Sequence, residues 1–339
     1  MDIKDIIFTF LKTKGTVTTA DVVGKTGFSR AHAQMFLKNL AAEGKIVRLG
    51  KANQAHYILA SKRAAAAAKP SKVRKIIANR ELAEDKVLSR IKEESSIFQK
   101  LPGNVSSIID YAFTEMLNNA IEHSESDKID VLVTKTATDV RFSVADRGVG
   151  IFNNIREKKR LASTMDAIQD LLKGKETTAP EAHSGEGIFF TSKIADFLTL
   201  KSFGKKVVFD NIGQDIYIKD IQSSKGTKVD FVLGLKSKKI LSDLFNQYTD
   251  ESLQFNKTGV KVKLYNRDVD YVSRSQARRI LAGLDKFQTI ELDFHNVETI
   301  GQAFADEVFR VWQTGHRDIK ITIKNANENI LFMIKRAQA

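Results

Sequence analysis

The chain has 339 residues, of which 42% are hydrophobic, and this is enough for two or three domains with cores of their own. The absence of cysteine excludes disulfides and thiolate metal sites. No run approaches the roughly 18–20 apolar residues of a membrane span, and no signal peptide is evident at the start, so we expect a cytoplasmic protein without a membrane partner.

The formal net charge of +13 is concentrated near one end of the chain. Residues 1–80 hold 16 of the 54 basic residues but only four of the 41 acidic residues. Beyond position 80 the two signs nearly cancel. Such a distribution is typical of a polyanion-binding module attached to near-neutral domains.

Residues 1–60 are predicted to form a winged helix-turn-helix domain. A helix over about residues 3–12 precedes a short helix that starts after Thr18 or Thr19, and a longer helix is capped by Ser29 and closed by Gly44. The β-rich runs of "KIVRLGKANQAHYIL" then form the wing. The candidate DNA contacts are Arg30, His32, Gln34 and Lys38 on the third helix, with Arg48 and Lys51 on the wing. A protein-binding winged helix is the alternative, but the charge favours double-stranded DNA.

Residues 61–99 are predicted to connect this domain to the next one. The segment "SKRAAAAAKPSK" is basic, rich in alanine and punctuated by proline, which is typical of a linker. "VRKIIANRELAEDKVLSRIKEES" follows it and is predicted to be a charged amphipathic helix that couples domains or subunits.

Two further domains follow, and together with the winged helix they predict a multidomain α+β protein. Residues 100–236 alternate between helical and strand-like runs in a way that predicts an α/β sandwich, a mixed sheet with helices on one face. In residues 260–339 strand and helix alternate regularly, which predicts a small α/β layer domain.

The segment "FTEMLNNAIEHS" carries polar residues on a helix whose other face is apolar. Glu115 and Asn119 lie one turn apart, so they project from the same side. The amide oxygen of Asn119 can ligate Mg²⁺ without adding a negative charge beside a phosphate. Glu115 can orient or deprotonate a nucleophile one turn away.

Three later segments complete the pattern. In "VADRGVGI" a strand ends in Asp146, whose carboxylate can accept a hydrogen bond from the exocyclic amine of a purine. "HSGEGIFF" places glycines at a helix start, where free N–H groups favour phosphate. "SSKGTKVDF" presents the hydroxyl of Thr227 to the edge of the base. The glycines that allow close approach of the backbone are Gly148, Gly150, Gly185 and Gly187.

In this order the four segments resemble the nucleotide-binding domain of the GHKL superfamily, which includes gyrase, heat-shock-90-type chaperones, histidine kinases and mismatch-repair ATPases. The resemblance covers about residues 100–235. It implies ATP and Mg²⁺ as cofactors, with Asn119 as metal ligand, Asp146 as adenine reader and Glu115 as catalytic base.

The same resemblance makes residues 152–183 the mobile ATP lid. Lys158, Lys159 and Arg160 in it are candidates for phosphate contact, with a solvated face as the alternative. One departure from the family pattern is Ile188-Phe189, where many members carry a further glycine.

The C-terminal part resembles STAS-like domains of the DUF4325 type through "TIELDFHNVETIGQAFADEVFRVW". In bacterial anti-sigma factor antagonists a GHKL-fold kinase phosphorylates a serine at the start of that helix. Gln302 and Ala303 stand at the matching positions, and the nearest hydroxyl belongs to Thr299. A packing or docking role is therefore favoured over a phosphorylation switch. A candidate acidic cluster, for which a solvated face is the alternative, consists of Asp293, Asp306 and Glu307.

Three functions fit these features, and the sequence leaves open whether the chain is an enzyme. The first is an ATP- and Mg²⁺-dependent DNA-binding regulator of transcription. The others are a Ser/Thr protein kinase of the anti-sigma-factor type and an ATP-driven dimer clamp. A histidine autokinase is disfavoured because residues 64–122 contain no histidine. The expected partners are double-stranded DNA, ATP, and either a second copy of the chain or a regulatory protein bound through the STAS-like domain.

Overall fold

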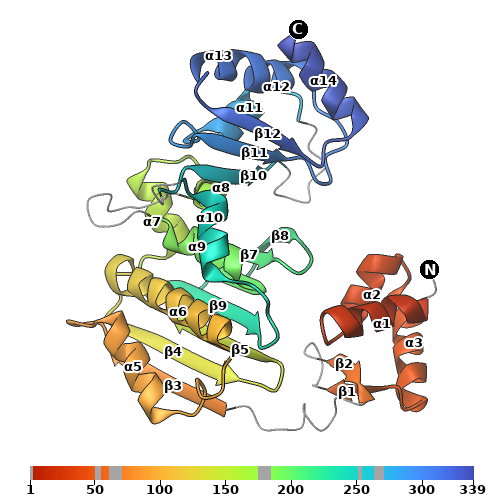
Figure 1. Ribbon diagram of the computed structural model, residues 1–339, viewed down its shortest axis with the longest axis vertical. Coiled ribbons are helices and arrows are strands. Elements are labelled where there is room, and N and C mark those ends of the chain that lie inside the picture. Colours follow the sequence, from red (N-terminus) through yellow and green to blue (C-terminus); the bar gives the residue numbers. More distant parts are fainter. Residues whose placement is uncertain (1–2, 50–54, 61–70, 175–184, 251–253, 263–270) are drawn as a thin grey trace. The chain divides into compact units, whose positions relative to one another are not determined.

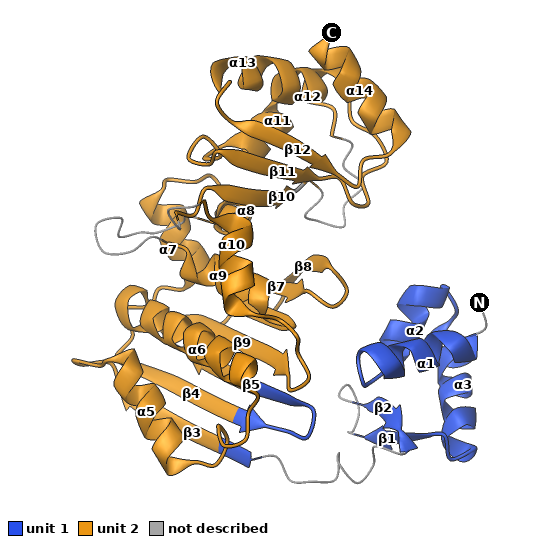
Figure 2. Ribbon diagram, in the orientation of Figure 1, with its two compact units in different colours: residues 1–72, 134–140 blue, residues 73–133, 141–339 orange. Residues whose placement is uncertain are grey.

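The computed structural model describes residues 3–49, 55–60, 71–174, 185–250, 254–262 and 271–339 (Figure 1). The chain divides into two compact units, residues 1–72 with 134–140 and residues 73–133 with 141–339 (Figure 2). None of the described helices is both long and apolar enough to cross a bilayer.

The N-terminal segment forms the predicted three helices and hairpin. Its elements are α1 (Ile3–Thr13), α2 (Thr19–Thr26), α3 (Arg30–Ala42), β1 (Ile46–Leu49) and β2 (His56–Leu59). Thr18 caps α2 in a reciprocal capping box with Asp21, and Ser29 caps α3 by accepting from the backbone N–H of His32. The strands pair antiparallel, and the tip between them, with the predicted contact Lys51, lies outside the described residues.

The large sheet has seven strands in the order β3-β4-β5-β9-β6-β7-β8. These are β3 (Ser71–Ala78), β4 (Lys128–Lys135), β5 (Asp139–Ala145), β6 (Phe197–Ser202), β7 (Lys205–Asp210), β8 (Asp215–Asp220) and β9 (Thr227–Gly234). The accompanying helices are α5 (Glu84–Glu94), α6 (Gly103–His123), α7 (Ile151–Lys158), α8 (Thr164–Lys173), α9 (Gly187–Ile194) and α10 (Leu241–Tyr248). Figure 1 shows α5 and α6 lying over one face of this sheet.

Aromatic packing identifies the face that the helices cover. Phe113 of α6 lies edge-on against Phe142 of β5, with ring centroids 5.5 Å apart, and Phe142 stacks on Phe231 of β9 at 4.8 Å. All three side chains are buried. Because side chains alternate along a strand, the neighbours of Phe142 and Phe231 in sequence project from the opposite face.

This architecture confirms the predicted fold class, a layer of helices on a sheet within a multidomain protein, but the sheet is antiparallel rather than mixed. The reason lies in the connections. The links between β6 and β7 and between β7 and β8 are short hairpins, which join neighbouring strands antiparallel, whereas a parallel pair needs a longer crossover. The strand β8 and the helix α10 have no counterpart in the sequence prediction.

The helix predicted from Val73 onward is wrong in its first part, because residues 71–78 form the edge strand β3 and α5 begins only at Glu84. The side chains of β3 alternate between half-buried and exposed, as a strand requires. Arg74 on β3 also donates two hydrogen bonds to Asp130 on β4, at 2.9 and 2.6 Å. Charged residues at helical spacing obscured the β-branched run that favours a strand. Of the predicted linker, residues 61–70 lie outside the described residues.

The C-terminal segment forms a three-stranded parallel sheet with helices, as the alternating pattern predicts. Its strands are β10 (Lys257–Lys261), β11 (Thr289–Asp293) and β12 (Lys320–Lys324). Its helical elements are α11 (Arg274–Leu281), α12 (Gln302–Asp306), the π-helical η3 (Glu307–Trp312), α13 (Gln313–Gly315) and α14 (Glu328–Gln338).

The core of this C-terminal domain includes residues from the larger sheet domain. Phe189 and Phe190 on α9 are buried in one cluster with Phe255, Phe287 and Phe304. Phe189 and Phe255 lie 4.6 Å apart between ring centroids, and α8 and α10 contact β10 (Figure 1). The two domains therefore share a continuous apolar core, which makes α9 a structural part of both.

Candidate functional site

Helix α6 presents Glu115 and Asn119 on one side, as their spacing predicts. The side-chain amide nitrogen of Asn119 donates to the carbonyl oxygen of Glu115 at 2.8 Å. Since a carbonyl oxygen only accepts, this bond fixes the NH₂ group toward the helix backbone and turns the amide oxygen away from it. Asn119 is therefore oriented so that an oxygen ligand faces outward.

Asp146 stands at the end of β5 and is held by backbone groups. Its Oδ1 accepts from the backbone N–H of Gly148 at 2.9 Å and from that of Thr227 at 3.1 Å. Its Oδ2 accepts no hydrogen bond from any residue that the structure describes. Burial raises the pKa of Asp146, and the hydrogen bonds from the backbone oppose that rise. The carboxylate is thus positioned with one oxygen engaged and the other oxygen available.

Thr227 links β9 to the glycine-rich turn after β5. Its hydroxyl oxygen accepts from the backbone N–H of Ile151 at 2.8 Å, which ties the start of α7 to the sheet. From the sequence, we expect this hydroxyl to face the edge of a base. The hydroxyl hydrogen can still be donated to a ligand, because the Ile151 bond uses only an acceptor lone pair.

Close packing explains two of the glycines. A Cβ placed on Gly187 would lie 2.0 Å from Oε2 of Glu115, so any other residue here would displace this carboxylate from the start of α9. A Cβ on Gly148 would lie 1.6 Å from the carbonyl oxygen of Ser124. The backbone N–H of Val149 donates to that same carbonyl at 2.8 Å. The turn after β5 is therefore pressed against the end of α6.

These groups line a single cavity of about 210 Å³. The predicted site residues among its lining are Glu115, Asn119, Asp146, Gly150, Gly185, Gly187 and Thr227. Gly148 is the one predicted residue of this set that does not line it, because it packs on Ser124 instead. Segments that are far apart in the sequence thus converge on one hollow beside the end of β5 and the start of β9.

The cavity also contains residues that the sequence analysis gave no role or did not name. Asn118 lines it beside Asn119, although we assigned it no chemistry. Asn154 on α7 lines it as well, is buried, and donates from its side-chain amide to the carbonyl oxygen of His123 at 3.2 Å. Its position between the apolar Phe152 and Ile155 was the signal that the sequence offered.

The basic residues of the predicted lid do not line this cavity. Lys159 pairs with Asp170 on α8 at 2.6 Å, and neither Lys158 nor Arg160 is among the lining residues. Of the predicted lid, the stretch from residue 175 to His183 lies outside the described residues. A phosphate contact by these three cations therefore has no support in the described part of the lid.

Helix α8, which lies in the predicted lid, is held to the C-terminal domain by a buried lysine. Lys173 at its end donates to the carbonyl oxygens of Arg279 at 3.2 Å and Ala282 at 2.6 Å, at the end of α11. The hydroxyl of Thr258 on β10 donates back to the carbonyl oxygen of Lys173. Burial lowers the pKa of Lys173 to about 8. This side of the cavity is therefore connected through α8, and through α9, to the C-terminal domain.

The predicted DNA contacts that the structure describes lie at the surface of the N-terminal segment. Arg30, His32, Gln34 and Lys38 are exposed on α3, and Arg48 is exposed on β1. The ring of His32 lies between two phenylalanine rings, 4.8 Å from Phe28 and 5.2 Å from Phe36 between centroids. The exposed side of α3 therefore combines positive charge with a row of neighbouring aromatic rings.

The acidic residues of the C-terminal domain are engaged in separate contacts. Arg310 pairs with Asp306, and Arg278 donates to the buried Glu307 at 2.6 Å. Asp293 accepts from the side-chain amide of Asn325 at 2.8 Å. Gln302, which stands where related domains carry an acceptor serine, begins α12 and has a buried side-chain oxygen without a partner among the described residues. These pairings support the solvated or structural interpretation of the acids.

Comparison with known protein families gives three matches along the chain. Residues 68–209 match the histidine kinase-like ATPase domain, and residues 276–331 match the STAS-like domain of unknown function (DUF4325). Residues 3–55 match the FaeA-like protein family, a winged-helix type. No curated protein matches the chain. The first match begins close to β3, in agreement with the structural place of that strand in the large sheet.

Proposed function

We propose that this chain, which combines a histidine kinase-like ATPase domain with a C-terminal STAS-like domain, is a regulator whose hold on double-stranded DNA depends on ATP and Mg²⁺. The observation that carries the proposal is the cavity between α6, the end of β5 and the start of α9. One wall of that cavity, α9, is also part of the core of the STAS-like domain. A ligand in the cavity can therefore change the packing of the STAS-like domain.

ATP would bind with its base at Asp146. The Oδ2 of this carboxylate is the acceptor available to the exocyclic amine of adenine, while Oδ1 is held by two backbone N–H groups. The hydroxyl of Thr227 is tied to Ile151 and lies on the same cavity. This arrangement supports recognition of adenine by a buried, preorganised acceptor.

Mg²⁺ would be held by Asn119 together with the phosphates. The donor set fits, because the amide oxygen of Asn119 is turned outward by its bond to the Glu115 carbonyl and hard oxygen atoms are the ligands that Mg²⁺ prefers. When bound, the ion neutralises phosphate charge. Glu115 lies against the proposed phosphate-binding turn at Gly187. In this position its carboxylate can orient a nucleophilic water or accept a proton from it.

The packing of α8 and α9 supports a route from the nucleotide to the rest of the chain. Lys173 on α8 donates to a carbonyl oxygen of the STAS-like domain, and Phe189 on α9 belongs to the apolar cluster that forms the core of that domain. A change in lid position therefore alters the packing of that domain. A ligand shifts a conformational equilibrium only when it binds one state more tightly than the other. Because α8 and α9 lie between the cavity and the STAS-like domain, a rearrangement of that domain can change the affinity of the cavity for its ligand. At the other end of the chain, the basic face of α3 supports binding to duplex DNA.

The test measures both ligands on one sample of the full chain. We expect Mg·ATP to change the affinity for a labelled duplex, and the duplex to change the affinity for Mg·ATP by the same factor, because coupling between two sites is reciprocal. Asn119→Ala should abolish the effect by removing a metal ligand, whereas Glu115→Ala should keep it, because the proposal requires occupancy and not hydrolysis. Independent binding of the two ligands in the wild-type chain would overturn the proposal.

A further inference from the structure

The face of the large sheet opposite α6 carries a row of four lysines in register. In the antiparallel pairs, Lys228 on β9 is opposite Lys201 on β6, and Lys201 is opposite Lys206 on β7. Lys206 is in turn opposite Lys219 on β8. The residues that alternate with them, Val229, Leu200 and Val207, are buried on the helix-covered face. We call these four residues the lysine row.

The row contains more positive charge than its surroundings neutralise. Asp230 serves two of its members at once, Lys201 at 2.9 Å and Lys228 at 3.3 Å. Lys206 and Lys219 form no ion pair with any residue that the structure describes. Burial and the neighbouring Lys201 and Lys219 lower the pKa of Lys206. Like charges directly opposite each other destabilise a sheet. Without a bound anion, the lysine row therefore lowers the stability of the folded chain.

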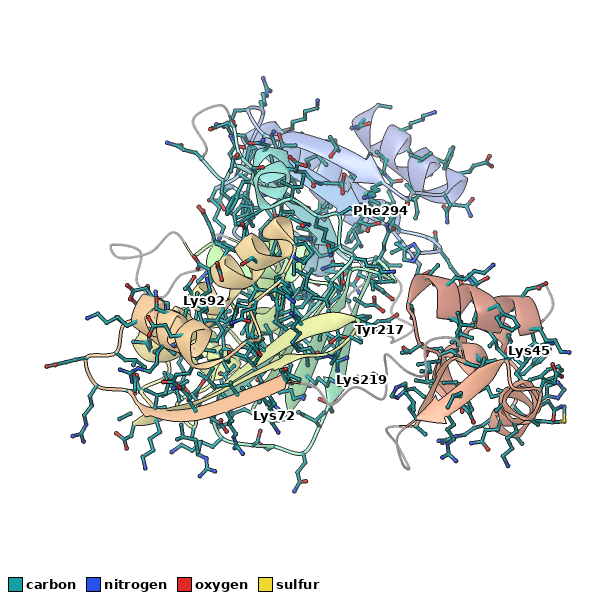
Figure 3. The ribbon with its side chains drawn as sticks, turned by 60° about the horizontal axis from the view of Figure 1, so that its bottom comes forward. Lys45, Lys72, Lys92, Tyr217, Lys219 and Phe294 are labelled. Carbon is teal, nitrogen blue, oxygen red and sulfur yellow. The ribbon has the colours of Figure 1, made fainter. Side chains whose placement is uncertain are left out.

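Protection of the sheet edge explains the position of only one of the four lysines. Lysines on edge strands prevent unwanted pairing with other chains, and this explains Lys219 on the edge strand β8. Lys201, Lys206 and Lys228 lie on interior strands, where no edge needs protection. Figure 3 labels Lys219 together with Tyr217, which is exposed two residues earlier on the same strand. The row therefore needs a different explanation.

The geometry of the row fits an extended polyanion. Neighbouring strands lie about 4.8 Å apart, so the four side chains form a line of about 14 Å across the sheet. A single phosphate or small anion requires side chains that converge on one point, which a flat row does not provide. The phosphate backbone of a duplex offers a line of negative charges. Asp230, the acid that acts on Lys206, is already shared by two other lysines of the row.

We infer that the lysine row is a second contact surface for the phosphate backbone of double-stranded DNA, in addition to the winged helix. The inference rests on the proposed function, because it takes the duplex held by the N-terminal domain as its ligand. Two weak surfaces on one chain raise each other's effective ligand concentration, so the row contributes to affinity without reading the sequence of the DNA.

The test compares two variants of the full chain that lose the same charge. Lys206→Gln with Lys219→Gln removes the unpaired half of the row, and Lys86→Gln with Lys335→Gln removes two exposed lysines from α5 and α14 as a control. Binding to a fluorescein-labelled duplex of mixed sequence is followed by anisotropy between about 50 and 200 mM salt. We expect the logarithmic salt slope to become shallower by about 1.8 in the row variant, because each lost phosphate contact contributes about 0.9, and to stay unchanged in the control.

The outcomes separate this inference from the proposed function. A row variant with the wild-type slope, together with a weakened Arg30→Ala variant, overturns the second surface and leaves the regulator proposal standing. A wild-type chain without affinity for the duplex overturns both. A slope change seen only with single-stranded DNA overturns the assignment to duplex. An unfolding midpoint of the row variant equal to or above that of the wild type shows that the variant folds. We expect this result because the substitutions remove like charges that face each other.

Discussion

The proposed nucleotide cavity draws Glu115, Asp146 and Thr227 from three segments far apart in the sequence, whereas the candidate DNA contacts of α3 come from one helix of 13 residues. In the cavity the side chains are held by backbone hydrogen bonds and by glycine contacts that leave no room for a Cβ. On α3 the charged side chains are exposed.

The two regions should respond differently to substitution. A partly buried, preorganised side chain interacts with its ligand in surroundings of low dielectric constant, so its removal should weaken binding strongly. Exposed lysines and arginines act through summed, salt-screened contacts with phosphate, so each contributes little. Loss of a cavity group should therefore have a larger effect than loss of any one exposed cation.

The largest effect is expected at Glu115. If the chain hydrolyses ATP, Glu115→Ala should lower turnover by about 10²–10⁴-fold, because general-base assistance is typically worth that much. Binding of Mg·ATP should remain. Steady-state turnover of labelled ATP measures the effect, and Glu122→Ala, another glutamate of α6 that lines the cavity, is the control. Turnover of Glu115→Ala at the wild-type rate would show that the base is another group.

Loss of the carboxylate at Asp146 should weaken ATP binding. In Asp146→Asn the oxygen that accepts from Gly148 and Thr227 can be kept, so the new NH₂ group faces the amine of adenine and two donors oppose each other. We expect a loss of about 1–3 kcal/mol in binding free energy. Calorimetry of ATP and GTP binding measures it, with the exposed Asp127→Asn as control. Unchanged ATP affinity would remove Asp146 from the site.

The lysine that joins α8 to the STAS-like domain should make stability depend on pH. Burial lowers the pKa of Lys173 to about 8, from an ordinary value of 10.5. Between these two values the unfolded chain binds more protons than the folded chain, so stability rises with pH; below about 8 both forms are protonated and this dependence ends. Relative to Lys173→Met, the wild-type free energy of unfolding should increase by roughly 2 kcal/mol from about pH 7.5 to 9.5.

Fluorescence of Trp312, the single tryptophan of the chain, reports the unfolding of the domain to which Lys173 is bound. The exposed Lys335→Met on α14 is the matched control and should run parallel to the wild type at every pH. A difference between wild type and Lys173→Met that stays constant with pH would contradict the buried cation.

The smallest single effects are expected on α3. Arg30→Ala and Lys38→Ala should each make the logarithmic salt slope of duplex binding shallower by about 0.9, because each removes one phosphate contact. Lys12→Ala, which removes an exposed lysine from α1 of the same domain, should leave the slope unchanged. Equal slopes for all three variants would favour a protein as the partner of this winged helix.

Much of the local structure was predictable because its causes lie within a few residues. Thr18 and Ser29 satisfy free N–H groups at helix starts, and these hydrogen bonds form where the sequence analysis expects the helices to begin. The polar face of α6 was recognisable from the spacing of Glu115 and Asn119. The roles proposed for these two residues stay predictions, although the structure places both on one cavity.

The errors arose where a long-range contact decides the structure. Residues 71–78 have a helix-like charge pattern, but pairing with β4 and the ion pair from Arg74 to Asp130 make them a strand. Asn154 gained a place in the cavity because α7 folds back against the end of α6. Such contacts depend on residues distant in sequence, which no local pattern reports.

The sequence alone indicated the helices and strands of the winged helix and of the C-terminal domain, the excess of positive charge in residues 1–80, and the polar and glycine residues that resemble nucleotide-binding motifs. Which of these residues come together depends on the tertiary structure. Strand register aligned four lysines into a row, and burial of Phe189 joined the ATPase domain to the STAS-like domain. The physical reason is that helix caps and amphipathic faces depend on neighbours in sequence, whereas register and domain contacts depend on the simultaneous packing of segments far apart in the chain.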